Sequence, residues 1–281
     1  MGRRVSHTQR EAYELCPYKY KLRYVERYKS SIQSSALVFG NALDNALNDL
    51  LLGKDTCHST FDSEWNKCAD LNIEYYSSDL DVSLLSPEEL TLPKPTQNFI
   101  SLARKGHKLL DAYKLDIMPR IKKVISVQGE VLVLGYDEFG EPTEDSITGK
   151  LDLVAIIEDD NGEDRTAVLD NKTTGSPYSK NSVKTKDQLP LYAQAFPDIE
   201  WFGYLTMNKK NFKTQVILDT VDEARKEEVL QKFVTMLDNI RDNKFEKNFK
   251  SCYSYGRRCK YWTHCHRGFF TPDIYQETKE K

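Results

Sequence analysis

Ala167-Val168-Leu169-Asp170-Asn171-Lys172 is the segment of this chain that is most informative about its fold. It reads as a buried strand, predicted over 165–171, that reaches a carboxylate and then, one residue further, a lysine. Side chains two residues apart on a strand share a face, so Asp170 and Lys172 should point the same way. The spacing alone is a weak signal, because Asp242-Asn243-Lys244 and Glu277-Thr278-Lys279 repeat it in surface settings.

A second acid lies in a similar setting eighteen residues earlier. Asp152 interrupts the otherwise apolar run Leu151-Asp152-Leu153-Val154, just after Gly149. If the two strands are neighbours, both carboxylates and the carbonyl of Asn171 offer hard oxygen ligands suited to Mg²⁺ or Mn²⁺. Such a metal polarises a phosphate and activates water, and Lys172 would orient that water or stabilise the developing charge. A structural alternative stays open, in which Asp152 caps a turn and Asp170 pairs with Lys172 at the surface.

The surrounding pattern predicts an α/β fold with a central mixed sheet flanked by helices. Strand-like segments rich in Val, Ile and Leu are expected at 123–134, 146–158, 165–171, 201–207 and 212–218. Helices are expected at 36–51, 61–77, 97–118, 188–196 and 222–242. Asp187 can cap the fourth of these helices, and Thr8 with Glu11, or Ser6 with Gln9, has the form of a capping box.

The segments form one compact unit in three parts. Residues 1–121 are the N-terminal helical region, 122–220 hold the sheet core, and 221–281 are a C-terminal helix with a Cys-rich segment. The 281 residues, 39% hydrophobic and 11% aromatic, are typical of a globular protein. No apolar run approaches the ~18 residues that span a bilayer, and no secretory signal opens the chain. We therefore expect a cytoplasmic protein with reduced thiols, in which clustered cysteines bind metal.

Charge is unevenly distributed along the chain. The net charge is −3, yet residues 1–30 and 247–281 each carry +5, so the middle carries −13. The two ends are either separately solvated or joined into one basic lobe that suits phosphates, beside an acidic body that can hold divalent metal.

The order of the motifs resembles that of RecB-like nucleases of the PD-(D/E)xK superfamily. Gly149 to Asp152 matches G-x-x-D, Asp170 to Lys172 matches D-x-K, and Gln188 to Tyr192 matches Q-x-x-x-Y. The resemblance implies a restriction-endonuclease-like core and a metal-dependent nuclease. It makes the two aspartates metal ligands, places Gln188 near the scissile phosphate and gives Tyr192 a supporting role.

Two further acids have places in that resemblance. Glu130 matches an acid often found on the strand before G-x-x-D. Asp44, in Phe39-Gly40-Asn41-Ala42-Leu43-Asp44, stands where the family usually carries a metal-binding histidine. Aspartate is also a hard-metal ligand, so this departure bears on metal number and affinity rather than on activity itself.

The six cysteines are Cys16, Cys57, Cys68, Cys252, Cys259 and Cys265. The last three form a C-x6-C-x5-C tail, and Cys16, followed by a proline, resembles the first ligand of RecB-like nucleases with a [4Fe–4S] cluster. The usual tail in that group is C-x2-C-x5-C, so Cys252 is the least well matched. Structural Zn²⁺ stays open as an alternative, with four thiolates or with His264 or His266 in place of one. Cys57 and Cys68 are expected to be free thiols.

Such a metal site would join the two basic ends, where tyrosines and arginines could hold single-stranded DNA. The predicted function is a DNA exonuclease using Mg²⁺ or Mn²⁺ at single-stranded or frayed ends, in recombination, repair or CRISPR-related processing. A helicase or recombination protein is a candidate partner, and the size resembles virus-encoded members. The alternatives are a catalytically weak or inactive DNA-end-binding subunit with a structural iron–sulfur or zinc site, and a zinc-bound interaction protein without a DNA role.

Overall fold

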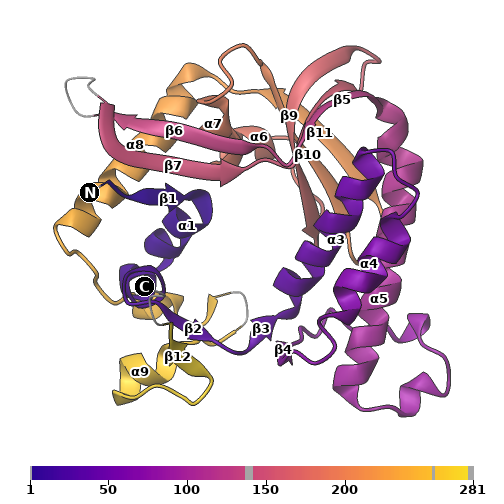
Figure 1. Ribbon diagram of the computed structural model, residues 1–281, viewed down its shortest axis with the longest axis horizontal. Helices are drawn as coiled ribbons and strands as arrows, with labels where there is room; N and C mark the ends of the chain where they lie inside the picture. Colours follow the sequence, from indigo (N-terminus) through magenta and orange to yellow (C-terminus); the bar gives the residue numbers. More distant parts are fainter. Residues whose placement is uncertain (1, 137–141, 255–256, 278–281) are drawn as a thin grey trace. The chain divides into compact units, whose positions relative to one another are not determined.

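The computed structural model describes residues 2–136, 142–254 and 257–277, and the chain divides into two compact units (Figure 1). The sheet unit consists of Gln33–Glu130 and Lys150–Arg225. The terminal unit consists of Met1–Ile32, Val131–Gly149 and Lys226–Lys281. The three-part division at residues 121 and 220 stays a prediction.

The sheet unit is built on five strands in the order β11-β10-β9-β8-β5. They are β5 (Ile121–Val127), β8 (Leu153–Glu158), β9 (Asp164–Thr174), β10 (Trp201–Asn208) and β11 (Thr214–Thr220). Strands β9 and β10 run parallel, whereas β5, β8 and β11 are antiparallel to their partners. The predicted mixed sheet is therefore confirmed.

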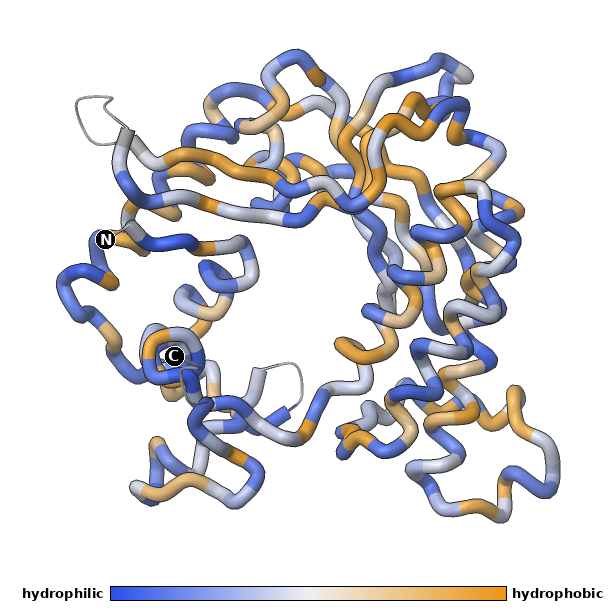
Figure 2. Tube along the Cα trace, in the orientation of Figure 1, coloured by the Kyte–Doolittle hydropathy of each residue, from blue (hydrophilic) through white to orange (hydrophobic). Residues whose placement is uncertain are grey.

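Helices α3 (Ser35–Leu51), α4 (Cys57–Asn66) and α5 (Lys94–Ala112) share one hydrophobic core with this sheet. Phe39, Leu47, Trp65 and Leu109 bury their side chains against it. Along these helices hydrophobic and hydrophilic residues alternate (Figure 2), as expected when one face is buried.

Shorter elements complete the sheet unit. They are β3 (Gln33–Ser34), β4 (Ile73–Glu74), η2 (Val82–Leu84), η3 (Glu89–Thr91), the π-turn η4 (Tyr113–Ile117), η5 (Met118–Arg120), α6 (Ser182–Thr185) and α7 (Gln188–Ala193).

The terminal unit brings distant parts of the sequence together. A small sheet has the order β1-β7-β6, from β1 (Arg4–Ser6), β7 (Pro142–Lys150) and β6 (Glu130–Tyr136). Strand β2 (Tyr28–Ser30) pairs with β12 (Ile274–Gln276). The helical elements are α1 (His7–Leu15), α2 (Pro17–Tyr20), η1 (Lys21–Val25), α8 (Glu223–Arg241), η6 (Phe249–Ser251) and α9 (Trp262–Arg267). The two ends of the chain thus meet, as the reading of one basic lobe requires. Among the described residues, no helix has the length and apolar character needed to cross a bilayer.

Several sequence-based boundaries were wrong. The segment 123–134 is two strands, because Gln128 takes a left-handed conformation (φ 55°) before Gly129. The segment 146–158 also breaks, at Leu151 and Asp152. These two breaks face each other, since Leu151 N–H donates to Gly129 O (2.9 Å) and Gln128 N–H donates to Asp152 O (3.0 Å). The helices expected over 61–77 and 188–196 end at Asn66 and Ala193, where tight turns follow.

Candidate active site

The pairing of β8 with β9 places the first two acids side by side. Leu153 lies opposite Leu169, so Asp152, just before β8, lies next to Asp170 near the middle of β9. The Asp152 Oδ2 atom accepts a hydrogen bond from the Asn171 backbone N–H at 2.7 Å. One carboxylate is thereby fixed to the backbone of the strand that carries the other.

Asp170 is the most enclosed acid of the group, with 2% of its surface exposed. Its Oδ1 accepts a hydrogen bond from Gln188 Nε2 at 2.7 Å, and its Oδ2 lies 2.6 Å from Lys172 Nζ. Apart from that ion pair, Oδ2 has no directed hydrogen bond, although it is buried. A buried carboxylate oxygen with spare acceptor capacity is a suitable ligand for a cation.

Helix α7 supplies the polar support for Asp170. Gln188 and Tyr192 are four residues apart on one helix face, and Gln188 Nε2 also donates to the Tyr192 hydroxyl at 3.1 Å. The Tyr192 hydroxyl in turn donates to Lys150 O at 3.0 Å. Burial raises the pKa of Tyr192 to about 12, so it stays a donor at neutral pH. This chain of bonds connects α7 to Asp170 on β9 and to the backbone of Lys150, two residues before Asp152.

Asp44 reaches the same group from α3. Burial, followed by the charge of Asp170, raises the pKa of Asp44 to about 6. Burial, followed by the charges of Asp170 and Asp44, raises the pKa of Asp152 to about 7. Burial likewise raises the pKa of Asp170. The pKa values rise because carboxylates are crowded in a site with little water.

Lys172 compensates only part of this negative charge. Burial by itself lowers its pKa, but the nearby Asp170 and Asp152 carboxylates outweigh that effect and raise the pKa above its usual value. Lys172 therefore stays protonated. One lysine cannot balance three carboxylates, so the site favours the binding of a further cation.

Not every predicted residue joins this group. Glu130 is exposed at the start of β6, and no contact of the described residues connects it to the three aspartates. The Asn171 side chain, as distinct from the backbone carbonyl that was predicted as a ligand, accepts a hydrogen bond at Oδ1 from the Tyr113 hydroxyl at 3.0 Å. Asp187 precedes α7 but does not cap it with its side chain, and it pairs instead with Arg225.

Two buried tyrosines were missed from the sequence. Tyr113, in η4, fixes the residue between Asp170 and Lys172. Tyr204 pairs with Asp170 across β10 and β9, and its buried hydroxyl has no hydrogen-bond partner among the described residues. Both continue apolar patterns in their elements, so periodicity assigns them to the core. Their polar ends carry no sequence signal.

Four of the cysteines line one pocket in the terminal unit. Cys16, Cys252, Cys259 and Cys265, which we call the cysteine pocket, are all free thiols there. Burial, followed by the charge of Cys259, raises the pKa of Cys265 to about 11. The Cys16 Sγ atom accepts a hydrogen bond from Asn248 N–H at 3.4 Å. Four thiols without disulfide partners are a donor set that suits iron–sulfur or zinc.

Neither the aspartate group nor the cysteine pocket has its ligand atoms arranged around a single metal position. Within residues 2–136, 142–254 and 257–277, no cluster of three or more His, Cys, Asp or Glu side chains has the arrangement of a formed metal site. The sequence-predicted residues therefore converge in two places, the aspartates in the sheet unit and the cysteines in the terminal unit, without forming a complete coordination shell.

Similarities to known proteins bear on the family. No curated protein matches the chain significantly. Among solved structures, SSO0001 is 16% identical, with 85% of this chain and 88% of that chain covered and a TM-score of 0.31. Scheffersomyces stipitis Rai1, in complex with (3'-NADP)+ and calcium ion, is 14% identical, with 91% and 64% covered and a TM-score of 0.21. Both scores are too low for either likeness to bear on fold or function.

The model of the PD-(D/E)XK nuclease superfamily matches residues 4–266, nearly the whole chain. The match spans the five-stranded mixed sheet, Asp152, Asp170 and Lys172. The chain belongs to the PD-(D/E)XK nuclease superfamily.

Proposed function

We propose that this chain is a RecB-like deoxyribonuclease that hydrolyses phosphodiester bonds with Mg²⁺ or Mn²⁺, as an exonuclease at single-stranded or frayed DNA ends. Nucleases of its superfamily typically use one of these ions, and DNA is the substrate that the superfamily implies. The observation that carries the proposal is the crowding of Asp44, Asp152 and Asp170 around one lysine in a buried site.

In this proposal Asp152 and Asp170 hold the metal ion, assisted by the Asn171 carbonyl and by Asp44. Glu130 is an auxiliary acid that would have to approach from the start of β6. The bound ion polarises the phosphate and lowers the pKa of water. Oxygen ligands of this kind fit Mg²⁺ and Mn²⁺ because both are hard cations.

The remaining residues act on the substrate. Lys172, held 2.6 Å from Asp170, orients the attacking water or stabilises the charge that develops on the phosphate. Gln188 positions the scissile phosphate with its amide, and Tyr192 holds that amide in place. When substrate arrives, Gln188 exchanges its bond to Asp170 for one to a phosphate oxygen.

The cysteine pocket is proposed to hold a [4Fe–4S] cluster, with structural Zn²⁺ as the alternative. Free thiols and a backbone N–H directed at Cys16 Sγ support this proposal, since hydrogen bonds to sulfur are typical around bound clusters. We further propose that the protein acts in the cytoplasm, in recombination, repair or CRISPR-related processing, beside a helicase or recombination partner. A virus-encoded origin belongs to the same proposal.

A digestion assay tests the proposed activity. End-labelled single-stranded and frayed duplex DNA is incubated with the protein and Mn²⁺, and products are sized over time. Wild type should shorten the label progressively, and Asp170→Ala should abolish this. The matched control is Asp242→Ala, because Asp242-Asn243-Lys244 repeats the tripeptide Asp170-Asn171-Lys172 at the end of α8. This variant should digest DNA like wild type.

The outcomes separate the proposal from its alternatives. Equal cleavage by wild type and Asp170→Ala would mean that the activity does not come from this site. No cleavage by either, together with tight binding of DNA ends, would favour the inactive end-binding subunit. Internal fragments from a circular substrate would mean that the protein is an endonuclease rather than an exonuclease.

A further inference from the structure

Aromatic side chains and arginines gather next to the cysteine pocket. In α9, the Trp262 ring stacks with the His266 ring at 4.5 Å between centroids, and Phe249 meets His266 at 5.2 Å. The guanidinium carbons of Arg258 and Arg267 lie 4.9 and 5.6 Å from the centre of the Trp262 ring. We call these five residues the aromatic–arginine platform.

The platform is open to solvent. Phe249 is 55% exposed, and His266, Arg258 and Arg267 are exposed as well, whereas Trp262 is half-buried. Exposed aromatic side chains that are contiguous with one another form a patch, and such patches on a folded surface commonly mark interaction sites, unlike single exposed residues. The platform therefore differs from the buried aromatic residues of the same unit, such as Tyr261.

The platform lies within a basic segment of the chain. No Asp or Glu occurs in residues 247–271, the segment that carries Arg258 and Arg267. The same segment carries six Lys and Arg residues. The segment therefore suits an anionic partner, and a partner whose anionic groups alternate with flat apolar faces matches the alternation of guanidinium and ring.

The cysteine pocket fixes the platform in place. Phe249 and Trp262 line that pocket, and the Cys252 Sγ atom lies 3.8 Å from His266 Nε2. A metal or cluster bound in the pocket would hold η6 and α9 together and would keep the stacked Trp262 and His266 rings and the edge-on Phe249 ring in place.

We propose that the aromatic–arginine platform binds single-stranded DNA, with bases stacked on Phe249, His266 and Trp262 and phosphates on Arg258 and Arg267. Every base presents an aromatic face once it is unpaired, so stacking accepts any sequence, whereas a duplex keeps these faces covered. Arginine binds phosphate with two parallel hydrogen bonds. The proposal deepens the proposed function, because it assigns the strand-binding surface for the substrate.

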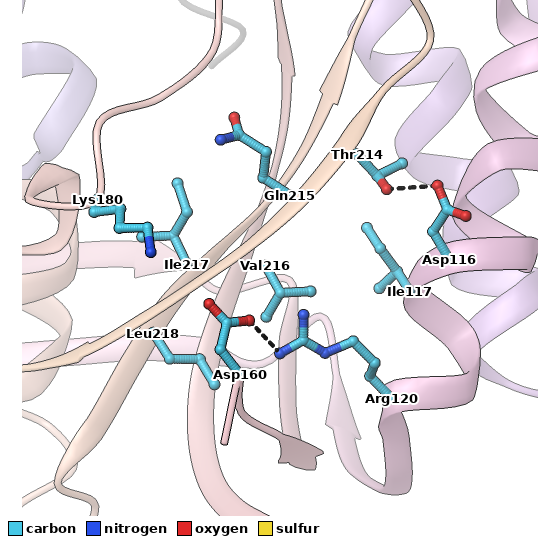
Figure 3. A pocket seen from close by; sticks show the side chains of 10 residues that line it. All are labelled: Asp116, Ile117, Arg120, Asp160, Lys180, Thr214, Gln215, Val216, Ile217 and Leu218. Carbon is cyan, nitrogen blue, oxygen red and sulfur yellow. Dashed lines mark hydrogen bonds and ion pairs between the residues drawn. The ribbon is translucent and has the colours of Figure 1, made fainter. Parts of the chain in front are cut away.

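Two other features of the structure give weaker support for a binding site. The pocket of about 360 Å³ along β11 is lined by mixed charges that largely satisfy each other (Figure 3). Arg120 pairs with Asp160 at 3.0 Å, and Asp116 accepts a hydrogen bond from Thr214 at 2.8 Å. The stacked pair His58 and His107 is likewise engaged by acids, at Asp111 and Asp62. Neither the pocket nor the histidine pair indicates which ligand would bind there.

Binding is tested without metal-dependent cleavage. The full-length protein, purified anaerobically with its iron and zinc content measured, is titrated in EDTA against a fluorescein-labelled thymidine 30-mer, and anisotropy is followed. Trp262→Ala should weaken binding about tenfold, as expected for the loss of one stacked base. Trp262→Phe should stay within about threefold of wild type. The matched control is Tyr275→Ala, since Tyr275 is a 50% exposed aromatic on β12 of the same unit.

The arginines are tested by salt. Arg258→Gln with Arg267→Gln should make the plot of log affinity against log salt shallower by about 1.4, because each of the two phosphate contacts on a single strand contributes about −0.7 to its slope. Unchanged binding by Trp262→Ala, equal weakening by Tyr275→Ala, or tighter binding of a blunt duplex than of the 30-mer would each overturn the proposal. If DNA binds through the platform but Mn²⁺ supports no cleavage, the platform stands and the proposed nuclease activity fails.

Discussion

At the scale of single residues, the raised pKa values of Asp44 and Asp152 have a consequence for stability. Their pKa values of about 6 and about 7 lie above the unfolded value of 3.8. Folding therefore benefits from these carboxyls while both states are protonated, below pH 3.8. The benefit is lost as the pH rises through 6 and 7, because the folded state then has to accommodate charges that the unfolded state solvates freely.

We predict that Asp152→Asn stabilises the metal-free protein at pH 8, by on the order of 1 to 3 kcal/mol, and has little effect at pH 4. Mn²⁺ should stabilise wild type at pH 8 but stabilise this variant much less. Urea unfolding with and without Mn²⁺ at both pH values measures these changes. Asp242→Asn is the control, since its exposed carboxylate pairs with Lys244 at 2.9 Å. Equal shifts in both variants would contradict the crowding of charge at Asp152.

Two fully buried tyrosines give a matched pair. The Tyr113 hydroxyl donates to Asn171 Oδ1, whereas the Tyr204 hydroxyl has no partner among the described residues. Tyr113→Phe should therefore lower the free energy of unfolding by about 1–2 kcal/mol, because it leaves the Asn171 side chain unpaired. Tyr204→Phe should be neutral or stabilising, since it removes an unsatisfied polar group. Chemical denaturation of the metal-free protein compares them, and the opposite order would show that the hydroxyl of Tyr113 does not hold Asn171.

At the scale of elements, two helix glycines should respond oppositely to the same change. A Cβ at Gly106 in α5 would lie 2.0 Å from the Phe61 ring of α4, whereas a Cβ at Gly40 in α3 would have no neighbour within 4 Å. Gly106→Ala should destabilise the protein by about 1–3 kcal/mol through overpacking. Gly40→Ala should stabilise it by about 0.5–1 kcal/mol, because alanine loses less backbone entropy in a helix. Thermal unfolding distinguishes the two variants. Equal shifts in melting temperature would mean that α4 and α5 lie further apart than the 2.0 Å approach requires.

The elements also show what the sequence could predict. Helix α3 and the strand β9 were predicted almost to their ends, because a long periodic or continuous apolar run is compatible with only one type of secondary structure. The breaks at Gln128 and Leu151 were not predicted, since they arise from hydrogen bonds between two segments rather than within one. The motif order, through its resemblance to a known family, predicted that Asp152, Asp170 and Gln188 belong to one site. The hydrogen bond from Tyr113 to Asn171 was not predicted, because it joins two distant segments and neither segment carries a local signal for it.

At the scale of the whole molecule, the chain ends converge in the terminal unit, and the cysteine pocket is the place where metal would join them. Tyr18 N–H donates to Glu246 O at 3.2 Å, and Asn248 Nδ2 donates to Leu15 O at 2.9 Å. These two hydrogen bonds, together with the pairing of β2 with β12, close a loop of more than 200 residues. Metal bound by four thiolates would add a large part of the folding free energy of this unit.

Cys259→Ser should therefore remove the bound metal and lower the melting temperature, whereas Cys68→Ser should retain the metal and lower the melting temperature less, since Cys68 is a partly buried residue that packs against the core of the sheet unit and does not line the cysteine pocket. Metal analysis and thermal unfolding of anaerobically purified protein give both quantities. Iron with a brown colour is expected in wild type. Colourless protein with stoichiometric zinc would mean that the pocket holds zinc rather than a cluster. Metal retained by Cys259→Ser would rule out this cysteine as a ligand.

The central claim is that Asp152 and Asp170, with Lys172 beside them, hold one divalent ion. X-ray diffraction from crystals soaked in Mn²⁺, recorded at the manganese absorption edge, locates that ion directly. An anomalous peak is expected about 2.0–2.4 Å from carboxylate oxygens of both aspartates. A crystal with ordered aspartates and no peak between them, or with a peak only elsewhere, would contradict it.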